Sequence, residues 1–303
     1  MNEKTKQRPM NILFADDGSQ HSLAAISLLG DLPLPPGSCV TVLAVLTPRE
    51  ASNHHVLENA LKQTQARLEE KAIPAQTELL LGYPAEVISE YADQHKPDLI
   101  ILGAKGLRAT LGILLGGVAQ QVIEYADWPV LVVRAPYPGI QNILFVTDGS
   151  ESSQEALEYF SSFPLPKKAS TFVMHVLPPA PSPEMIMQTW PLGPEMPYPV
   201  PAQVQAETQV WLGEEEQMGK DLLERTLKSL EGQGIKATSV LARGDAATEI
   251  IEYVKENRID LIVAGSRGLS QMRGWLLGSV SRKLVHYAGC SVLVVKGDTK
   301  SED

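Results

Sequence analysis

The chain has 303 residues, which is more than one ordinary domain needs and enough for two domains that each bury a core. Hydrophobic residues make up 44% and charged residues 20%, a globular composition that excludes a largely disordered or fibrous protein. The net charge of −10 offers no basic surface for nucleic-acid phosphates, and no apolar run approaches the length of a membrane span. Neither nucleic acid nor membrane insertion is therefore expected.

The N-terminal residues are polar and pass directly into a strand-like run, without the apolar centre of a secretory signal, so a cytoplasmic location is expected. Cys39 and Cys290 stand in strand-like surroundings without a CxxC pair and are expected to be reduced thiols. His175 is interpreted as a strand histidine, and His54 and His55 as a surface pair, because no further ligand stands at metal-binding spacing. No metal site built from protein ligands alone is predicted.

The first half of the chain alternates between strand-like and helix-like segments. A strand is predicted for residues 11–15, where an apolar run ends in an Asp-Gly-Ser turn. The spacing of Leu57, Leu61, Thr64 and Leu68 predicts a helix with one semi-apolar face, followed by a strand near 76–81. The continuously apolar run 99–102 is typical of a parallel strand covered on both faces, and 129–133 is the last strand-like run.

The second half repeats the first. Residues 142–150 repeat 11–19, residues 259–269 repeat 97–107, and residues 291–295 repeat 129–133. The semi-apolar helical face returns as Met218, Leu222, Thr226 and Leu230. We therefore predict two homologous, doubly wound α/β domains of Rossmann-like type, each with an open parallel five-stranded sheet flanked by helices.

The expected boundaries are a polar tail (1–8), a first domain (9–136), a linker (137–141), a second domain (142–296) and a polar tail (297–303). Asn11 corresponds to Asn142 and Asp98 to Asp260, so the offset grows from 131 to 162 residues and the second copy holds about 31 extra residues. These fall at about 178–206, a stretch too rich in proline for a helix or a central strand and predicted to be extended. Its large apolar side chains leave open whether it is a spacer, packs on a domain or meets a partner: Met185, Ile186, Met187, Trp190, Met196 and Tyr198.

The strongest motif follows the predicted fourth strand of the second copy and reads Gly265-x2-Gly268-x9-Gly278-Ser279. Glycines permit positive φ and a close approach of the backbone to an anion. A helix predicted to begin at Gly278 and Ser279 would direct unpaired N–H groups at a phosphate, with the Ser279 and Ser281 hydroxyls as further donors. Arg267 suits a charge-assisted bond to the outer phosphates, or is a solvated surface arginine.

Together with the Asp-Gly-Ser turn, this motif resembles that of the ATP-binding branch of the universal stress protein family, and the resemblance extends over both copies. It implies ATP or another adenine nucleotide as the ligand, with Mg²⁺ as an optional companion. It places Asp148, beside Thr147, near the ribose and adenine, and Val176 next to adenine. It implies that the phosphates bind at Gly265, Arg267, Gly268, Gly278, Ser279 and Ser281, and Val280 is included in the same nucleotide site. A turn or N-cap carboxylate is the alternative role for Asp148.

The first domain carries a degenerate copy of the motif. Gly117 and Ala119 replace the two serines, so two hydroxyl donors are lost and weaker or absent binding is expected. A purely structural first domain is the alternative. The implied first-domain site consists of Asp17, Val45, Gly103, Lys105, Gly106, Gly116 and Gly117.

Three functions follow from these observations. The first is a nucleotide-binding stress or signalling protein whose ATP occupancy alters its shape or its contact with an unidentified protein partner. The second is a slow ATPase, although no catalytic residue is assigned, because the sequence contains no GxxxxGK[ST], GxGxxG or GxSxG motif. The third is a scaffold with vestigial sites that uses the proline-rich insertion as its contact surface. The resemblance also implies an intramolecular pseudo-dimer, with 129–133 paired to 291–295, and leaves a further homodimer open.

Overall fold

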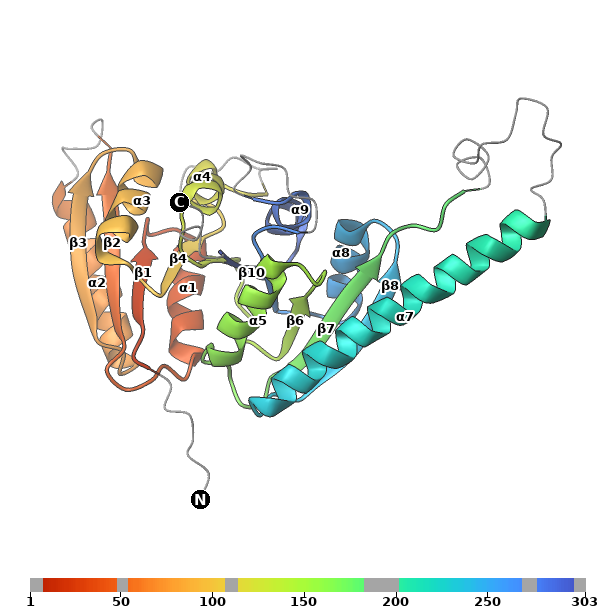
Figure 1. Ribbon diagram of the computed structural model, residues 1–303. Coiled ribbons are helices and arrows are strands. Elements are labelled where there is room, and N and C mark those ends of the chain that lie inside the picture. The colour runs from red at the N-terminus through yellow and green to blue at the C-terminus, as the bar shows by residue number, and fades with distance from the viewer. Residues whose placement is uncertain (1–7, 48–53, 107–113, 183–201, 269–276, 297–303) are drawn as a thin grey trace, which may run out of the picture.

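The computed structural model describes residues 8–47, 54–106, 114–182, 202–268 and 277–296. Each half of the chain contributes five parallel strands (Figure 1). The strands of the first half are β1 (Asn11–Ala15), β2 (Cys39–Leu46), β3 (Ala75–Leu81), β4 (Leu99–Gly103) and β5 (Val130–Val133). Those of the second half are β6 (Asn142–Val146), β7 (Ser170–Leu177), β8 (Ala237–Arg243), β9 (Leu261–Gly265) and β10 (Ser291–Val295).

All ten strands form one sheet in the order β3-β2-β1-β4-β5-β10-β9-β6-β7-β8. The central contact joins β5 to β10 in antiparallel fashion, with Leu131 opposite Leu293. This is the pairing expected between 129–133 and 291–295, and it gives each half a partner for a strand that would otherwise be an edge. Because the halves run in opposite directions, their carboxyl edges lie at opposite ends of the central strands.

Helices cover both faces of the sheet, as the predicted doubly wound class requires (Figure 1). One face carries α1 (Gln20–Asp31), α2 (His54–Glu70), α5 (Glu151–Ser162) and α7 (Ala202–Gly232). The other carries α3 (Pro84–His95), α4 (Gly117–Tyr125), α8 (Ala246–Glu256) and α9 (Ser279–Tyr287). Alternate strand residues enter opposite cores: Ile12 and Phe14 pack under α1, whereas Leu13 packs toward α3. The fold class predicted from the sequence is confirmed.

The helical face predicted around Leu61 is buried at Leu61, Thr64 and Leu68. In the second copy the prediction was wrong at one position, because Met218 is 63% exposed and its neighbour Gly219 is buried. A Cβ atom at Gly219 would stand 3.0 Å from Leu177 and Leu241, so glycine lets α7 approach β7 and β8 closely. This approach turns Met218 toward solvent.

Part of the predicted insertion, residues 183–201 with all six of its large apolar side chains, lies outside the described residues. The extended conformation predicted for this stretch does not reach Ala206, because α7 begins at Ala202. Ala202 follows Pro201, the last proline of the stretch, and from there the chain is free to form a helix. Within the part of the chain that the structure describes, no helix is long and apolar enough to cross a bilayer.

Both cysteines are free thiols, as expected from their spacing. Burial raises the pKa of the Cys290 thiol to about 12, so it remains protonated at neutral pH. Its buried position in the bend before β10 makes it part of the core.

Candidate functional site

The turn after β6 is shaped by side-chain hydrogen bonds within the Thr-Asp-Gly-Ser segment. Gly149 has φ +79°, which accounts for glycine there, and the Asp148 Oδ1 atom accepts a hydrogen bond from the Ser150 amide at 3.0 Å. Ser150, not Asp148, is the N-cap of α5, because its hydroxyl accepts from the Ser153 amide at 3.2 Å. Asp148 is thus a turn carboxylate with its second oxygen directed elsewhere.

That second oxygen lies against Gly268. A Cβ atom at Gly268 would stand 2.6 Å from Asp148 Oδ2, and in the first domain a Cβ at Gly106 would stand 2.6 Å from Asp17 Oδ2. The structure therefore brings the aspartate of each turn and the second glycine of each motif together. These residues follow β6 and β9 in one domain and β1 and β4 in the other, and the two strands of each pair are neighbours in the sheet.

The first two motif glycines of the second domain do not use the positive φ that glycine permits. Gly265 and Gly268 instead each lie in close contact with a neighbouring segment. A Cβ at Gly265 would stand 2.6 Å from the Ser152 carbonyl oxygen in α5. The fold alone thus gives two of the motif glycines a reason, independent of any ligand.

The helix after the motif begins without a capping side chain. Gly278 is the N-cap of α9, and its amide donates to the Ser266 carbonyl at 2.7 Å. Gly116 is placed identically before α4, its amide donating to the Ala104 carbonyl at 2.8 Å. Glycine has no side chain with which to cap, in contrast to Ser150 at α5. The first N–H groups of α9 and α4 are therefore oriented for an acceptor from outside the helix.

The two motif serines differ in their surroundings. Ser279 opens α9 and is exposed, so its hydroxyl is accessible from the loop side. Ser281 is buried, and its hydroxyl donates to the Gly265 carbonyl at 2.7 Å. The donor expected at Ser281 is used inside the fold, where it joins the first turn of α9 to the end of β9. Ala119, at the equivalent position of α4, cannot form this bond.

The remaining predicted residues lie at the same strand ends. Thr147 is buried, and its hydroxyl is 3.1 Å from that of Ser153. Val176 and Val280 are partly buried and pack against the core on the α9 side of the sheet, and Val45 is placed likewise in the first domain. His175 lies on the opposite side, with Nδ1 2.8 Å from the Thr147 carbonyl, which satisfies its ring as expected.

Sequence reasoning missed two cations that cross the junction between the domains. Arg134 follows β5, and its guanidinium donates to the Val285 and His286 carbonyls at 2.6 and 3.0 Å. Lys296 follows β10, and its ammonium donates to the Glu124 carbonyl at 3.4 Å. Each cation therefore binds the last turn of the other domain's motif helix. The sequence did contain a signal for both cations, because a basic residue follows the last strand of each copy.

The second of these cations lies near the motif loop. The pKa of Lys296 is lowered to about 8, mainly by burial and also by the guanidinium of Arg267, while the Asp127 and Glu124 carboxylates oppose the shift. Arg267 is thus within electrostatic reach of Lys296, and its own amide donates to Ser152 Oγ at 3.2 Å. Glu124 is also 3.4 Å from Arg282 of α9. The carboxyl edge of the second domain is bordered by the end of α4 from the first.

One group of side chains at the start of α2 has the spacing of metal ligands, but its surroundings do not favour a cation. Among the described residues, His54, His55 and Glu58 have ligand atoms within 4.8 Å of one another at the start of α2. The Glu58 carboxylate is also 3.1 Å from the Lys62 ammonium, which competes with a cation, and both histidines are exposed. The surface interpretation of the His54 and His55 pair suits this geometry.

Comparison with known proteins relates this two-domain architecture to one protein family. The sequence model of the universal stress protein family matches residues 9–134 and again 139–296. A universal stress protein of Methanocaldococcus jannaschii is 33% identical over 127 residues, covering 42% of this chain and 71% of that protein. One of Mycolicibacterium smegmatis is 25% identical over 259 residues, covering 83% of this chain and 79% of that protein.

The fold is also similar to a solved structure. The crystal structure of a universal stress protein from Archaeoglobus fulgidus superimposes with a TM-score of 0.66 at 19% identity, covering 95% of this chain and 97% of that one. Its coverage extends over both halves, so the likeness concerns the two-domain arrangement as well as the single domain. From the two family matches and this shared architecture, the chain belongs to the universal stress protein family and carries two copies of its domain.

Proposed function

We propose that the second domain binds an adenine nucleotide, ATP, at the carboxyl edge of β6 and β9. The observation that carries the proposal is the N-terminus of α9, where Gly278 is the N-cap next to the Arg267 segment and no side chain caps the helix. A phosphate there would accept from amides that the helix itself leaves unpaired, and it would compensate the mutual repulsion of Arg267 and Lys296.

The base and sugar are assigned to the neighbouring strand ends. Asp148, held by the Ser150 amide, directs its other oxygen toward Gly268 and would accept hydrogen bonds from the ribose hydroxyls. Val176 and Val280 supply apolar surface on the α9 side of the sheet, which suits a flat adenine ring. ATP as the particular nucleotide rests on the likeness of the motif to the ATP-binding branch of the family.

Occupancy would be transmitted through α9. Its first turn would contact phosphate, and its last turn already holds Arg134 of the first domain. A nucleotide that shifts or stiffens α9 would therefore alter the junction between the domains, where a partner protein could detect it. The protein would act as a nucleotide-dependent stress or signalling component.

Native mass spectrometry of the gently purified protein tests this proposal. ATP, AMP and cAMP are added separately to the wild type, to Gly278→Asp and to the matched first-domain variant Gly116→Asp. We expect one ATP per chain, lost in Gly278→Asp and kept in Gly116→Asp. No bound adenine nucleotide would refute the proposal and favour a scaffold with vestigial sites. Two ATP molecules of equal affinity would contradict the assignment to the second domain alone.

A further inference from the structure

Among the described residues, the long helix α7 has one face that no other element covers. Its 31 residues extend about 46 Å, and Figure 1 shows that its N-terminal half projects beyond the sheet. The packed side contacts β7 and β8 through residues such as Gly219, Leu223 and Leu230. On the outer side, Trp211 is 45% and Met218 63% exposed, and Val210 is also 63% exposed, so large apolar side chains face solvent there.

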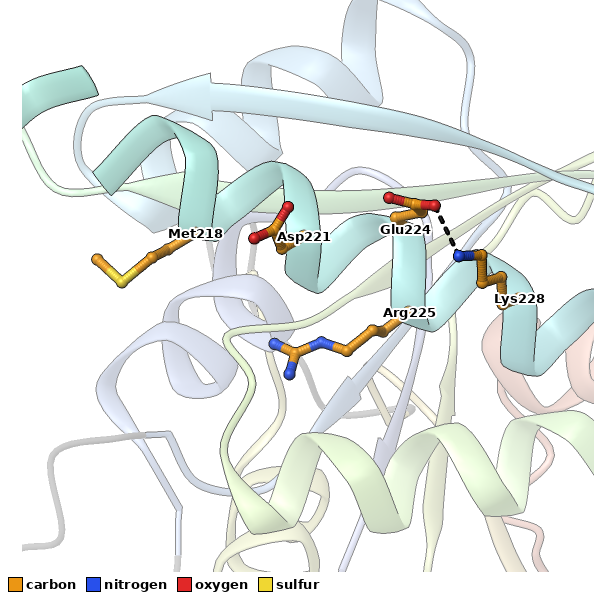
Figure 2. Close-up of a pocket in the computed structure, with 5 residues that line it drawn as sticks. All are labelled: Met218, Asp221, Glu224, Arg225 and Lys228. Carbon is orange, nitrogen blue, oxygen red and sulfur yellow. Dashed lines mark ion pairs between the residues drawn. The ribbon is translucent and has the colours of Figure 1, made fainter. Parts of the chain in front are cut away.

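Six of the exposed residues of α7 form a stripe with the alternating three- and four-residue spacing of a coiled-coil seam. This α7 stripe consists of Trp211, Glu214, Met218, Asp221, Arg225 and Lys228, all exposed. Figure 2 shows its last four members, together with Glu224, around a shallow hollow on the outer face of the helix. The apolar and acidic members come first along the helix, and both basic members come last.

This order makes the α7 stripe complementary to itself when reversed. We propose that it is the contact surface for a second copy of this chain, with two α7 helices packed antiparallel around a twofold axis. In that register Trp211 meets Lys228 of the second copy, Glu214 meets its Arg225, and Met218 meets its Asp221. Each contact occurs twice, as an isologous interface requires.

The charges of the α7 stripe favour a second copy of this chain as the partner, and they favour antiparallel over parallel packing. A parallel pair would set Glu214 beside Glu214 and Arg225 beside Arg225, whereas the antiparallel pair places opposite charges together. Trp211 would receive an ammonium group against its ring, a favourable contact for an indole that is half exposed in one chain. The existing bonds on this face are exchangeable surface contacts within the helix, Glu224 to Lys228 at 2.7 Å and Gln217 to Asp221 at 2.8 Å.

The interface is small, with six positions a side over about 26 Å of helix, so we expect a weak and reversible dimer. Sedimentation equilibrium from about 1 to 200 µM at about 0.1 M salt measures it. The wild type should show concentration-dependent dimerisation. Glu214→Arg alone and Arg225→Glu alone should each weaken it about tenfold or more, because either change places two like-charged pairs in the interface.

Mixing the two single variants supplies the decisive comparison. In the mixed dimer, the arginine introduced at position 214 of one chain would face the glutamate introduced at position 225 of the other. The second contact would join the native Arg225 to the native Glu214, so association should return although each variant alone has lost it. Lys255→Glu on α8, away from the stripe, is the control for net charge and should leave dimerisation unchanged. Circular dichroism checks that all variants fold.

The competing occupant is a segment of the same chain, because residues 183–201 immediately precede α7. If that segment covers the stripe, the wild type will sediment as a monomer at every concentration while Trp211 is protected from a fluorescence quencher. That result would overturn the proposal. Dimers unaffected by either charge reversal, or single variants that do not recover on mixing, would overturn it as well.

Discussion

The guanidinium group of Arg134 donates a 2.6 Å hydrogen bond to the Val285 carbonyl, which joins the last strand of the first domain to the end of α9 in the second. Lys296 makes the symmetry-related contact with Glu124 at the end of α4. Both cations stand where a helix leaves its carbonyl groups unpaired and its dipole is negative. The two motif helices are therefore each attached at one end to their own strand-end loop and at the other to the opposite domain.

Replacing Arg134 should weaken the junction strongly. Arg134→Met removes bonds to Val285, His286 and Leu114 and leaves partly buried carbonyls unpaired, so we expect a loss of about 2–4 kcal/mol in the free energy of unfolding. Urea denaturation measures it. Arg8→Met is the matched control, because Arg8 pairs with Asp98 from a side chain that is 84% exposed and should cost less than about 1 kcal/mol. Equal losses in both variants would contradict the role of the junction.

The close contact of Gly268 with Asp148 predicts an effect on binding rather than on folding. In Gly268→Ala the new methyl group would displace the Asp148 carboxylate, which is the movable end of a side chain, so stability should change by less than about 1 kcal/mol. If Asp148 holds the ribose, ATP affinity should fall about tenfold or more in isothermal titration. Gly106→Ala repeats the contact in the first domain and should leave the second-domain affinity intact.

The two motif serines should separate into a binding role and a structural role. Ser279→Gly, which copies the first domain, removes an exposed hydroxyl and should weaken ATP binding about two- to tenfold with little effect on stability. Ser281→Ala removes the donor to the buried Gly265 carbonyl and should cost about 1–3 kcal/mol of stability. Thermal unfolding and titration on both variants test this division. A larger binding loss in a fully stable Ser281→Ala would show that its hydroxyl contacts the ligand.

The pH dependence of stability should reveal Lys296. Its folded pKa of about 8 lies below the ordinary value of 10.5, so above pH 8 the unfolded chain binds more protons than the folded one. Stability therefore rises through this group as the pH increases from about 8 toward 10.5, by up to about 3 kcal/mol, because burying its charge has a cost at lower pH. Urea denaturation of wild type and Lys296→Met between pH 7 and 9.5 isolates the difference. If the free energy of unfolding depends on pH in the same way in both proteins, the contribution assigned to Lys296 is excluded.

The sequence alone determined the repeat and the fold class. The correspondence of residues 142–150 with 11–19, and of 291–295 with 129–133, requires two similar units, and the apolar run 99–102 requires a strand covered on both sides. The Asp-Gly-Ser turn and the glycine motif also identified the strand ends that meet, since neighbouring parallel strands share a carboxyl edge. The repeat, the apolar strand and the glycine motif are all patterns of neighbouring residues, so they can be identified from the order of residues along the chain.

The tertiary structure alone decided how individual side chains are used. The Ser281 hydroxyl turns inward to Gly265, Met218 turns outward because Gly219 takes the packed position, and the motif glycines are needed for close contacts with α5 and Asp148. The roles of Arg134 and Lys296 depend on the antiparallel junction of β5 and β10, which brings each cation to a helix end more than 100 residues away. Such contacts follow from the direction in which packed elements approach, and spacing along the chain does not encode that direction.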